Sequence, residues 1–332
     1  MFKRVTAVAH SNIALVKYWG KRDHVLNLPA VGSISLTLEA LSTKTSVRFD
    51  PELVSDQLIL NGKPGEMDKT HRISNFLDHI RLQAKIAFFA HVESHNNFPT
   101  GAGLASSASA FAALTYAAAG AAGFKLQKKE LSVLARRGSG SAARSIFGGI
   151  VEMHRGEAGN GLDAYAEQIA DASYWDLRMI VVVTDEREKN TGSSRGMTVS
   201  AETSPYYPAW VETSEHDMSE MRNAINKKDI ERIGEITEYS CMKMHALMLS
   251  THPALIYWNG STVEIFQHVR ELRRQGIPAW FTVDAGPQVK ILTLPEYEQS
   301  VKEAMAARKG VKRIICSGLG PDAHLVEDGR FD

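Results

Sequence analysis

The apolar residues of this chain recur at two different spacings, which predict helices and strands. Ile73, Phe76, Leu77 and Ile80 lie three or four residues apart, so they share one face of a helix over residues 70–85. Similar patterns predict further helices over residues 104–122, 128–137, 209–226, 229–248 and 262–275. Short apolar runs predict strands at residues 5–9, 58–60, 87–92, 149–153, 179–184, 279–283 and 289–294.

The order of these elements favours an α+β fold. Strands and helices do not alternate regularly, as they would in a doubly wound parallel sheet. Asn61-Gly62 after the strand at residues 58–60 indicates a hairpin turn. Residues 185–204 are polar and contain glycine, so we expect a loop there and a domain boundary near residue 185. The chain has 332 residues, enough for two domains, which we place at residues 1–185 and 186–332.

Composition and charge exclude several classes of protein. Hydrophobic residues make up 44% of the chain and charged residues 23%, as in ordinary globular proteins. Lysine plus arginine equals aspartate plus glutamate, at 38 each, so no broad nucleic-acid surface is expected, although a local cationic pocket remains possible. The two cysteines, Cys241 and Cys316, exclude a disulfide scaffold and a four-cysteine zinc site. No apolar run is long enough for a membrane span, and we expect a cytoplasmic protein.

Residues 99–110, with the sequence PTGAGLASSASA, carry the strongest chemical signal. Gly101 and Gly103 would let the backbone approach a ligand closely, and Ser106 and Ser107 open an alanine-rich helix. The unpaired N–H groups and the positive dipole at a helix N-terminus bind phosphate well. Taken alone, the segment is also compatible with a glycine turn before a tightly packed helix.

Three further segments place charged side chains in unusual settings. Arg144 follows the glycines and serines of residues 138–141, and its guanidinium suits a carboxylate or a phosphate. Lys17 follows four apolar residues, which makes it a candidate pocket lysine. Asp284 ends an apolar strand just before a tight turn, where partial burial would perturb its pKa. Each also has a simpler explanation, namely a surface turn, a strand end and an aspartate that caps its own turn.

Signatures of other nucleotide enzymes and hydrolases are missing. The sequence contains no G-x-x-x-x-G-K-[ST], no G-x-G-x-x-G between a strand and a helix, and no G-x-S-x-G. His91 and His95 have a metal-ligand spacing only if they are helical, and their segment reads as a strand.

Together, the four segments resemble those of the diphosphomevalonate decarboxylases in the GHMP kinase superfamily. Residues 12–22 read NIALVKYWGKR, and residues 96–109 are similar to the family's NNFPTAAGLASSA loop, with Gly101 where alanine is usual. Residues 138–145 resemble GSGSAxRS, and residues 281–287 resemble FTxDAGP. The resemblance implies a GHMP-kinase-like two-domain fold. It would combine an N-terminal ribosomal-protein-S5-like α+β domain with a C-terminal ferredoxin-like α+β domain, with the active site in the cleft.

The resemblance also implies a reaction that depends on ATP and Mg²⁺. Mevalonate 5-diphosphate would be phosphorylated at its C3 hydroxyl and would then lose phosphate and CO₂ to give isopentenyl diphosphate. A homodimer is usual for the family, and no nucleic-acid or membrane partner is expected. Two alternatives stay open. One is a related enzyme that acts on mevalonate or its monophosphate, as a 3-kinase or a decarboxylase, and the other is a non-catalytic homologue that binds metabolites.

The family's residue roles carry over to positions that match its motifs. Asp284 would take the C3 hydroxyl proton or orient that hydroxyl, Lys17 would keep Asp284 ionised, and Arg144 would hold the substrate's carboxylate. ATP phosphates would bind Gly101, Ala102, Gly103, Leu104, Ala105, Ser106 and Ser107, with Ser107 also nearest Mg²⁺. The substrate would bind Asn12, Tyr18, Lys21, Ser139, Gly140, Ser141, Arg144, Ser193 and Met197. Some relatives carry a diphosphate-binding arginine at the position of Ser194, so the role of the neighbouring Arg195 is open.

Overall fold

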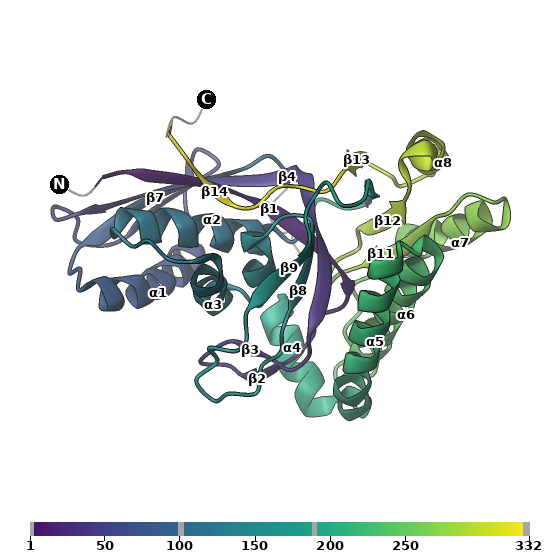
Figure 1. Ribbon diagram of the computed structural model, residues 1–332, viewed down its shortest axis with the longest axis horizontal. Helices are drawn as coiled ribbons and strands as arrows, with labels where there is room; N and C mark the ends of the chain where they lie inside the picture. The colour runs from purple at the N-terminus through teal and green to yellow at the C-terminus, as the bar shows by residue number, and fades with distance from the viewer. Residues whose placement is uncertain (1–2, 99–102, 188–190, 328–332) are drawn as a thin grey trace.

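Two β-sheets and the helices packed on them make up the molecule (Figure 1). The computed structural model describes residues 3–98, 103–187 and 191–327. The larger sheet contains β1 (Val5–Val16), β4 (Ser33–Asp50), β5 (Gln57–Leu60), β6 (Lys63–Pro64), β7 (Phe89–Asn96), β8 (Ile150–Met153), β9 (Ala166–Ala170) and β14 (His324–Val326). The smaller sheet contains β10 (Arg178–Val183), β11 (Trp280–Val283), β12 (Val289–Thr293) and β13 (Arg313–Ser317), and β2 (Lys21–Asp23) pairs with β3 (Leu28–Pro29).

The predicted α+β class is confirmed, and the connections of both sheets are irregular. The larger sheet runs β14-β1-β4-β7-β5-β6, with β8 beside β4 and β9 beside β8. The smaller sheet runs β11-β12-β10-β13, so β11 is an edge strand. The last strand, β14, returns to the larger sheet and pairs with β1. The division of the chain at residue 185 stays a prediction.

The long strand β4 pairs antiparallel with β1 along most of its length and was missed in the sequence analysis. Residues 33–38 alternate hydroxyl and apolar side chains at the period of a strand, with Ile34 and Leu36 in the core. The hydroxyls of Ser33 and Ser35 are also buried, and both accept hydrogen bonds from Arg144. This strand therefore serves both the core and the site.

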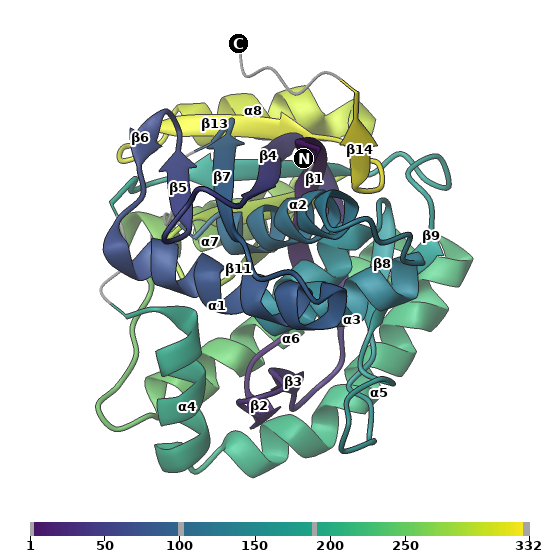
Figure 2. The same cartoon turned by 90° about the vertical axis from the view of Figure 1, so that its left-hand side faces the viewer.

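The helices α1 (Met67–Ala84), α2 (Ser106–Ala121) and α3 (Lys128–Gly138) lie together beside the larger sheet (Figures 1 and 2). Eleven of the sixteen residues of α2 are buried, seven of them alanines, and the helix packs directly against β1 and β4. Residues 138–141 are largely helical, because Gly138 ends α3 and Gly140 begins a 3₁₀ helix, η1 (Gly140–Ile146). The predicted hairpin after residue 60 is confirmed, because β5 and β6 are joined by Asn61 and Gly62, both with positive φ.

The second group of helices, α5 (Tyr207–Lys227), α6 (Ile230–Leu249), α7 (Gly260–Arg274) and α8 (Glu298–Ala306), packs around the smaller sheet (Figure 1). The strand β10 is buried on both faces. Its residues Met179 and Val181 share a core with β1 and α5, whereas Ile180 and Val182 share a core with α7. The short 3₁₀ helix η2 (Pro295–Tyr297) leads into α8. No helix in the described part of the chain is long and apolar enough to cross a membrane.

The prediction of a loop at residues 185–204 is wrong for its second half, which forms the helix α4 (Ser193–Thr203). The indole N–H of Trp19 donates to the Ser200 hydroxyl at 3.0 Å, and Met197 packs with Trp19, Trp210 and Met244. These partners are distant in sequence, and a short helix is stabilised mainly by such tertiary packing. Local sequence alone could not show them. The other predicted helices and strands are present, and most of their ends are shifted by a few residues, although β1 runs to Val16 instead of residue 9.

Candidate active site

A cavity of about 700 Å³ lies where residues that follow β1 and β11 meet the N-terminus of α2. Among the described residues, its wall carries one carboxylate, Asp284, and a larger set of cations: Lys17, Lys21, Lys69, Arg72, Arg137, Arg144 and Arg195. The chain as a whole is neutral. The cationic pocket that a neutral composition left possible is therefore present, and it would attract anionic ligands.

Asp284 lies between two lysines. Lys17 directly follows β1, and its Nζ lies 2.6 Å from Oδ1 of Asp284, which directly follows β11. Nζ of Lys290, in β12, lies 3.1 Å from Oδ2. Burial alone would raise the pKa of Asp284, but the two ammonium groups outweigh it and hold this pKa well below its usual range. Because 26% of its side chain is exposed, the carboxylate remains open to a ligand.

The helix α6 binds the backbone beside both members of this ion pair. The hydroxyl of Ser240 accepts the backbone N–H of Lys17 at 3.0 Å. The sulfur of Cys241 accepts the N–H of Val283, next to Asp284, and Nε2 of His245 donates to the Val283 carbonyl at 3.2 Å. Burial lowers the pKa of His245 to about 3, so this donor is neutral at physiological pH. These contacts give His245 a structural role.

Arg144 is buried in η1 and forms no ion pair with any described carboxylate. Its guanidinium donates to Oδ1 of Asn12 and to the hydroxyls of Ser33 and Ser35, all neutral groups. Burial lowers its pKa to about 10, so it stays charged at neutral pH. The amide N–H of Asn12 donates in turn to the Ser141 carbonyl at 3.0 Å. This bond holds the amide oxygen of Asn12 towards Arg144. An uncompensated buried cation on a cavity wall suits an anionic ligand.

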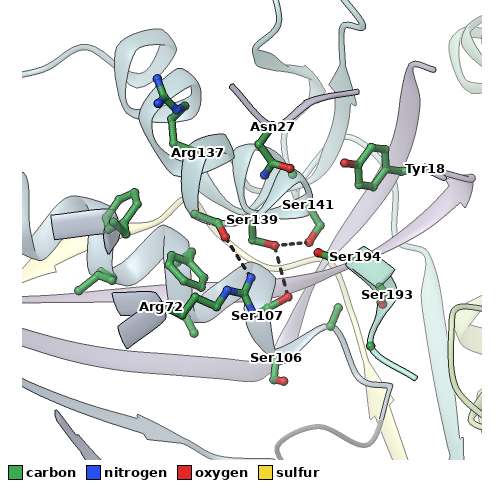
Figure 3. Close-up of a pocket in the computed structure, with 18 of the residues that line it drawn as sticks. Tyr18, Asn27, Arg72, Ser106, Ser107, Arg137, Ser139, Ser141, Ser193 and Ser194 are labelled. Atoms are coloured by element: carbon green, nitrogen blue, oxygen red, sulfur yellow. Dashed lines mark hydrogen bonds between the residues drawn. The ribbon is translucent and has the colours of Figure 1, made fainter. Parts of the chain in front are cut away.

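Tyr18 contributes a buried hydroxyl that has no hydrogen-bond partner in the described structure. Burial raises its pKa to about 12, so it remains a neutral donor. A Cβ on Gly140 would lie 2.4 Å from this hydroxyl, so the close approach requires glycine at that position. Figure 3 shows Tyr18 near Ser141, on the wall that also carries Ser139.

Three seryl hydroxyls connect the N-terminus of α2 to the loop after α3 (Figure 3). Oγ of Ser139 lies 3.3 Å from Oγ of Ser107 and 3.3 Å from Oγ of Ser141. The α2 N-cap, Ala105, has a φ of 56° and no side-chain cap. The first N–H groups of α2 can therefore bind an anion. Ser106 also lines the cavity.

The predicted phosphate-binding segment is only partly described. Gly101 and Ala102 lie outside the described residues, whereas Gly103 and Ala105 line the cavity. Leu104 places its side chain in the hydrophobic core instead of on the wall. From here on, the phosphate loop means residues 103–107.

The helix α4 contributes Ser193, Ser194, Arg195 and Met197 to the wall of the cavity. Nζ of Lys21 lies 3.5 Å from the Ser194 hydroxyl. Burial, and then the nearby charge of Arg72, lowers the pKa of Lys21. Lys21 therefore contacts α4 on one side and lies near the charge of Arg72 on the other.

Two cations of the site were not predicted from the sequence: Arg72, on the wall of the cavity, and the fully buried Lys290, which contacts Asp284. Arg72 donates to the Gly138 carbonyl at 3.0 Å and packs over the ring of Phe111. Arg72 precedes Ile73 and so borders the apolar face of α1. The apolar pattern predicts the helix but does not show that a charged residue beside it lines a cavity. Lys290 is the single lysine in an otherwise apolar strand segment, which was the signal available for it.

Comparisons with known proteins cover nearly the whole chain. Residues 9–166 match the diphosphomevalonate decarboxylase-like N-terminal domain, and residues 179–320 match the mevalonate 5-diphosphate decarboxylase C-terminal domain. The chain is 36% identical to the diphosphomevalonate decarboxylase of Candida albicans, over 95% of this chain and 96% of that protein. It is 37% identical to the human diphosphomevalonate decarboxylase, over 91% of this chain and 79% of that protein.

Solved structures are similar over the same length. Mevalonate diphosphate decarboxylase from Staphylococcus aureus superposes with a TM-score of 0.93 at 40% identity, covering 98% of this chain and 99% of the other. The structure described as MDDEF in complex with MVAPP, AMPPCP and magnesium has the same TM-score, identity and coverage.

Proposed function

The chain belongs to the diphosphomevalonate decarboxylase family, and from this premise we propose that it is the ATP-dependent decarboxylase of mevalonate 5-diphosphate. The products are isopentenyl diphosphate, ADP, phosphate and CO₂. One observation carries the proposal most directly. The Lys17–Asp284 ion pair, 2.6 Å long, faces the same cavity as the uncapped N-terminus of α2 and the uncompensated Arg144.

The first step is phosphorylation of the C3 hydroxyl of mevalonate 5-diphosphate. This tertiary alcohol is a crowded and weakly acidic nucleophile, so it must be oriented towards the γ-phosphoryl group. An ionised carboxylate has acceptor capacity beyond its two lysine contacts, and Asp284 uses it to bind the hydroxyl. Because its pKa is held low, Asp284 orients the hydroxyl first and takes the proton only as the O–P bond forms. Lys17 adds positive charge beside the transferred group.

The second step breaks two bonds of the phosphorylated intermediate. As phosphate leaves C3, the C1–C2 bond breaks, CO₂ departs, and the electrons of that bond form the C2–C3 double bond. Arg144 binds the carboxylate through its planar guanidinium, whose orientation Asn12 and Ser35 fix. The carboxylate is thereby held in a geometry in which the breaking C–C bond can align with the leaving phosphate.

The remaining groups of the wall bind the phosphates. The ATP phosphates lie at the N-terminus of α2, and the substrate's diphosphate binds Tyr18, Lys21 and Arg72 together with the hydroxyls of Ser139 and Ser141. Gly140 leaves room for Tyr18, and Ser193 and Met197 close the substrate end. Arg195 also lines this part of the cavity and adds to its positive charge.

A magnesium ion fits this site as part of the nucleotide complex. Mg²⁺ prefers oxygen ligands and often binds through substrate phosphates with few protein carboxylates. The cavity's one described carboxylate, Asp284, already contacts two lysines, so the Ser107 hydroxyl is the better protein ligand. When bound, the ion would neutralise charge on the phosphate oxygens. The similar structure with AMPPCP and magnesium supports this part of the proposal.

A homodimer in the cytoplasm completes the proposal. The homodimer rests on the family resemblance, and the cytoplasmic location rests on a sequence without an apolar run long enough for a membrane span. Light scattering during size-exclusion chromatography would test the dimer.

The substrate is tested by supplying ATP and Mg²⁺ with mevalonate 5-diphosphate, mevalonate 5-phosphate or mevalonate. We expect kcat/KM to favour the diphosphate by on the order of 10²-fold or more, because the cationic groups around Lys21 are otherwise left without their anion. Release of ADP without CO₂ from any of the three would indicate a 3-kinase instead. Thermal stabilisation by both ligands without turnover would indicate a metabolite-binding homologue.

A further inference from the structure

Lys290 stands in the middle of β12, a strand whose five residues are all buried. Its backbone pairs with Thr282 of β11 and Val181 of β10, and its side chain is fully buried. Burying an ammonium group is unfavourable unless it is paired and hydrogen-bonded. Burial accordingly lowers the pKa of Lys290, and the charge of Asp284 opposes this shift. A valine or methionine would pack at this position without that penalty.

The ammonium group of Lys290 contacts two parts of the site at once. It lies 3.1 Å from Oδ2 of Asp284 and donates to the backbone carbonyl of Gly103 at 2.9 Å. Gly103 has a φ of +79°, and a Cβ there would lie 3.0 Å from Cα of Gly286, in the turn after Asp284. Gly103, in the phosphate loop, therefore lies against the turn that follows Asp284, and the ammonium group of Lys290 contacts both Gly103 and Asp284.

We propose that Lys290 is a positioning residue for phosphoryl transfer, which fixes the carboxylate of Asp284 relative to the backbone of the phosphate loop. This inference rests on the proposed function. Lys17 alone contacts only Oδ1, which leaves the carboxylate plane free to rotate. A second cation at Oδ2 fixes that plane, and its bond to Gly103 fixes the distance to the ATP phosphates. Misplacement of reacting groups by about 1 Å lowers a rate by on the order of 10²-fold.

The charges around Asp284 come from several elements. Lys17 and Lys290 contact it directly, and Arg144 of η1 acts on it from farther away. Cys241 and His245 of α6 face it as well, but burial raises the pKa of the thiol and lowers that of the imidazole, so both are neutral. Removing Lys290 therefore removes one of three cations, and the pKa of Asp284 rises.

The test compares wild type with Lys290→Met and with the control Ile291→Val. Methionine keeps the length of the side chain but lacks the charge and the donors, whereas Ile291 packs in the core of the smaller sheet. We expect Lys290→Met to lower kcat on the order of 10–100-fold with little change in KM for mevalonate 5-diphosphate. The acid limb of the kcat profile should move to higher pH. The Tm should stay equal or rise, because a buried charge is removed while Asp284 keeps Lys17. Ile291→Val should keep the wild-type kcat and pH profile.

Two outcomes would overturn the proposal. One is a Lys290→Met variant with the kcat and acid limb of wild type. The other is a variant with a lowered Tm whose kcat per folded active site, counted by ligand titration, equals that of wild type. Lack of turnover by wild type itself would reject the proposed function, so the two failures are distinguishable.

Discussion

Arg136 and Arg144 are both buried arginines that form no ion pair with a described carboxylate, but their surroundings differ. Arg136 donates to the backbone carbonyls of Leu26, Gly161 and Ala164, which belong to two loops. Arg144 donates to an amide and two hydroxyls and lines the cavity. The first arginine therefore holds the fold together, and the second keeps its charge available for a ligand.

Replacing each arginine by methionine should separate these two roles. For Arg144→Met we expect kcat/KM for mevalonate 5-diphosphate to fall on the order of 10²–10³-fold with little loss of stability. For Arg136→Met we expect a loss of about 2 kcal/mol or more of unfolding free energy, because loop carbonyls lose their donors, with KM unchanged. Steady-state kinetics and urea unfolding of both variants measure this. A similar loss of stability in both would argue against a ligand-binding role for Arg144.

Some of these residues could be predicted from sequence, and the reason others could not is physical. Asp284, Lys17 and Arg144 stand next to glycines or at the ends of apolar runs, where a charged side chain is conspicuous. Lys290 and Arg72 lie inside regular elements. A pattern of apolar residues does not show whether a polar residue between them faces solvent or a cavity. Only the tertiary structure brings Lys290 to Asp284.

At the level of elements, α6 does more than cover the smaller sheet. Because β11 is an edge strand, the backbone groups on its free side need hydrogen-bond partners. The side chains of Cys241 and His245 bind the backbone N–H and carbonyl of Val283. Ser240, one residue earlier, binds the backbone of Lys17. The sequence predicted this helix but not its contacts. It missed α4 altogether, because that helix depends on Trp19 and Trp210, which are distant in sequence.

His245 should make stability depend on pH. Its pKa is about 3 in the folded protein and about 6.5 when unfolded, so between these values only the unfolded state takes up the proton. Its stabilising contribution is complete above pH 6.5 and is lost as the pH falls towards 3, by about 2 kcal/mol at pH 5. We expect His245→Asn, which keeps a neutral donor, to lose this part of the pH dependence. Urea unfolding at pH 7.5 and 5.0 would measure it, and equal pH dependence in the two proteins would be contrary to this account.

On the scale of the whole molecule, the site is assembled from both sheets. The strand β1 begins in the core beneath α2, with Ala7 and Ala9, and ends in the core shared with β10, with Ile13 and Leu15. Lys17 follows it and meets Asp284 from the smaller sheet. The periodicity of the sequence indicated only a mixture of helices and strands, whereas the resemblance to a family implied the cleft. The chain is neutral as a whole, and its cations gather around the cavity only when the two sheets come together. The composition therefore could not predict where the positive charge lies.

The most direct test of the account is to count ADP and CO₂ together, for wild type and for Asp284→Ala. With mevalonate 5-diphosphate, ATP and Mg²⁺, wild type should release one CO₂ for each ADP. The variant should lose both products in parallel by at least ~10³-fold, because it lacks the group that orients the C3 hydroxyl and accepts its proton. Its thermal stabilisation by the two ligands should persist. ADP release without CO₂ from wild type, or near-normal turnover by the variant, would contradict the account.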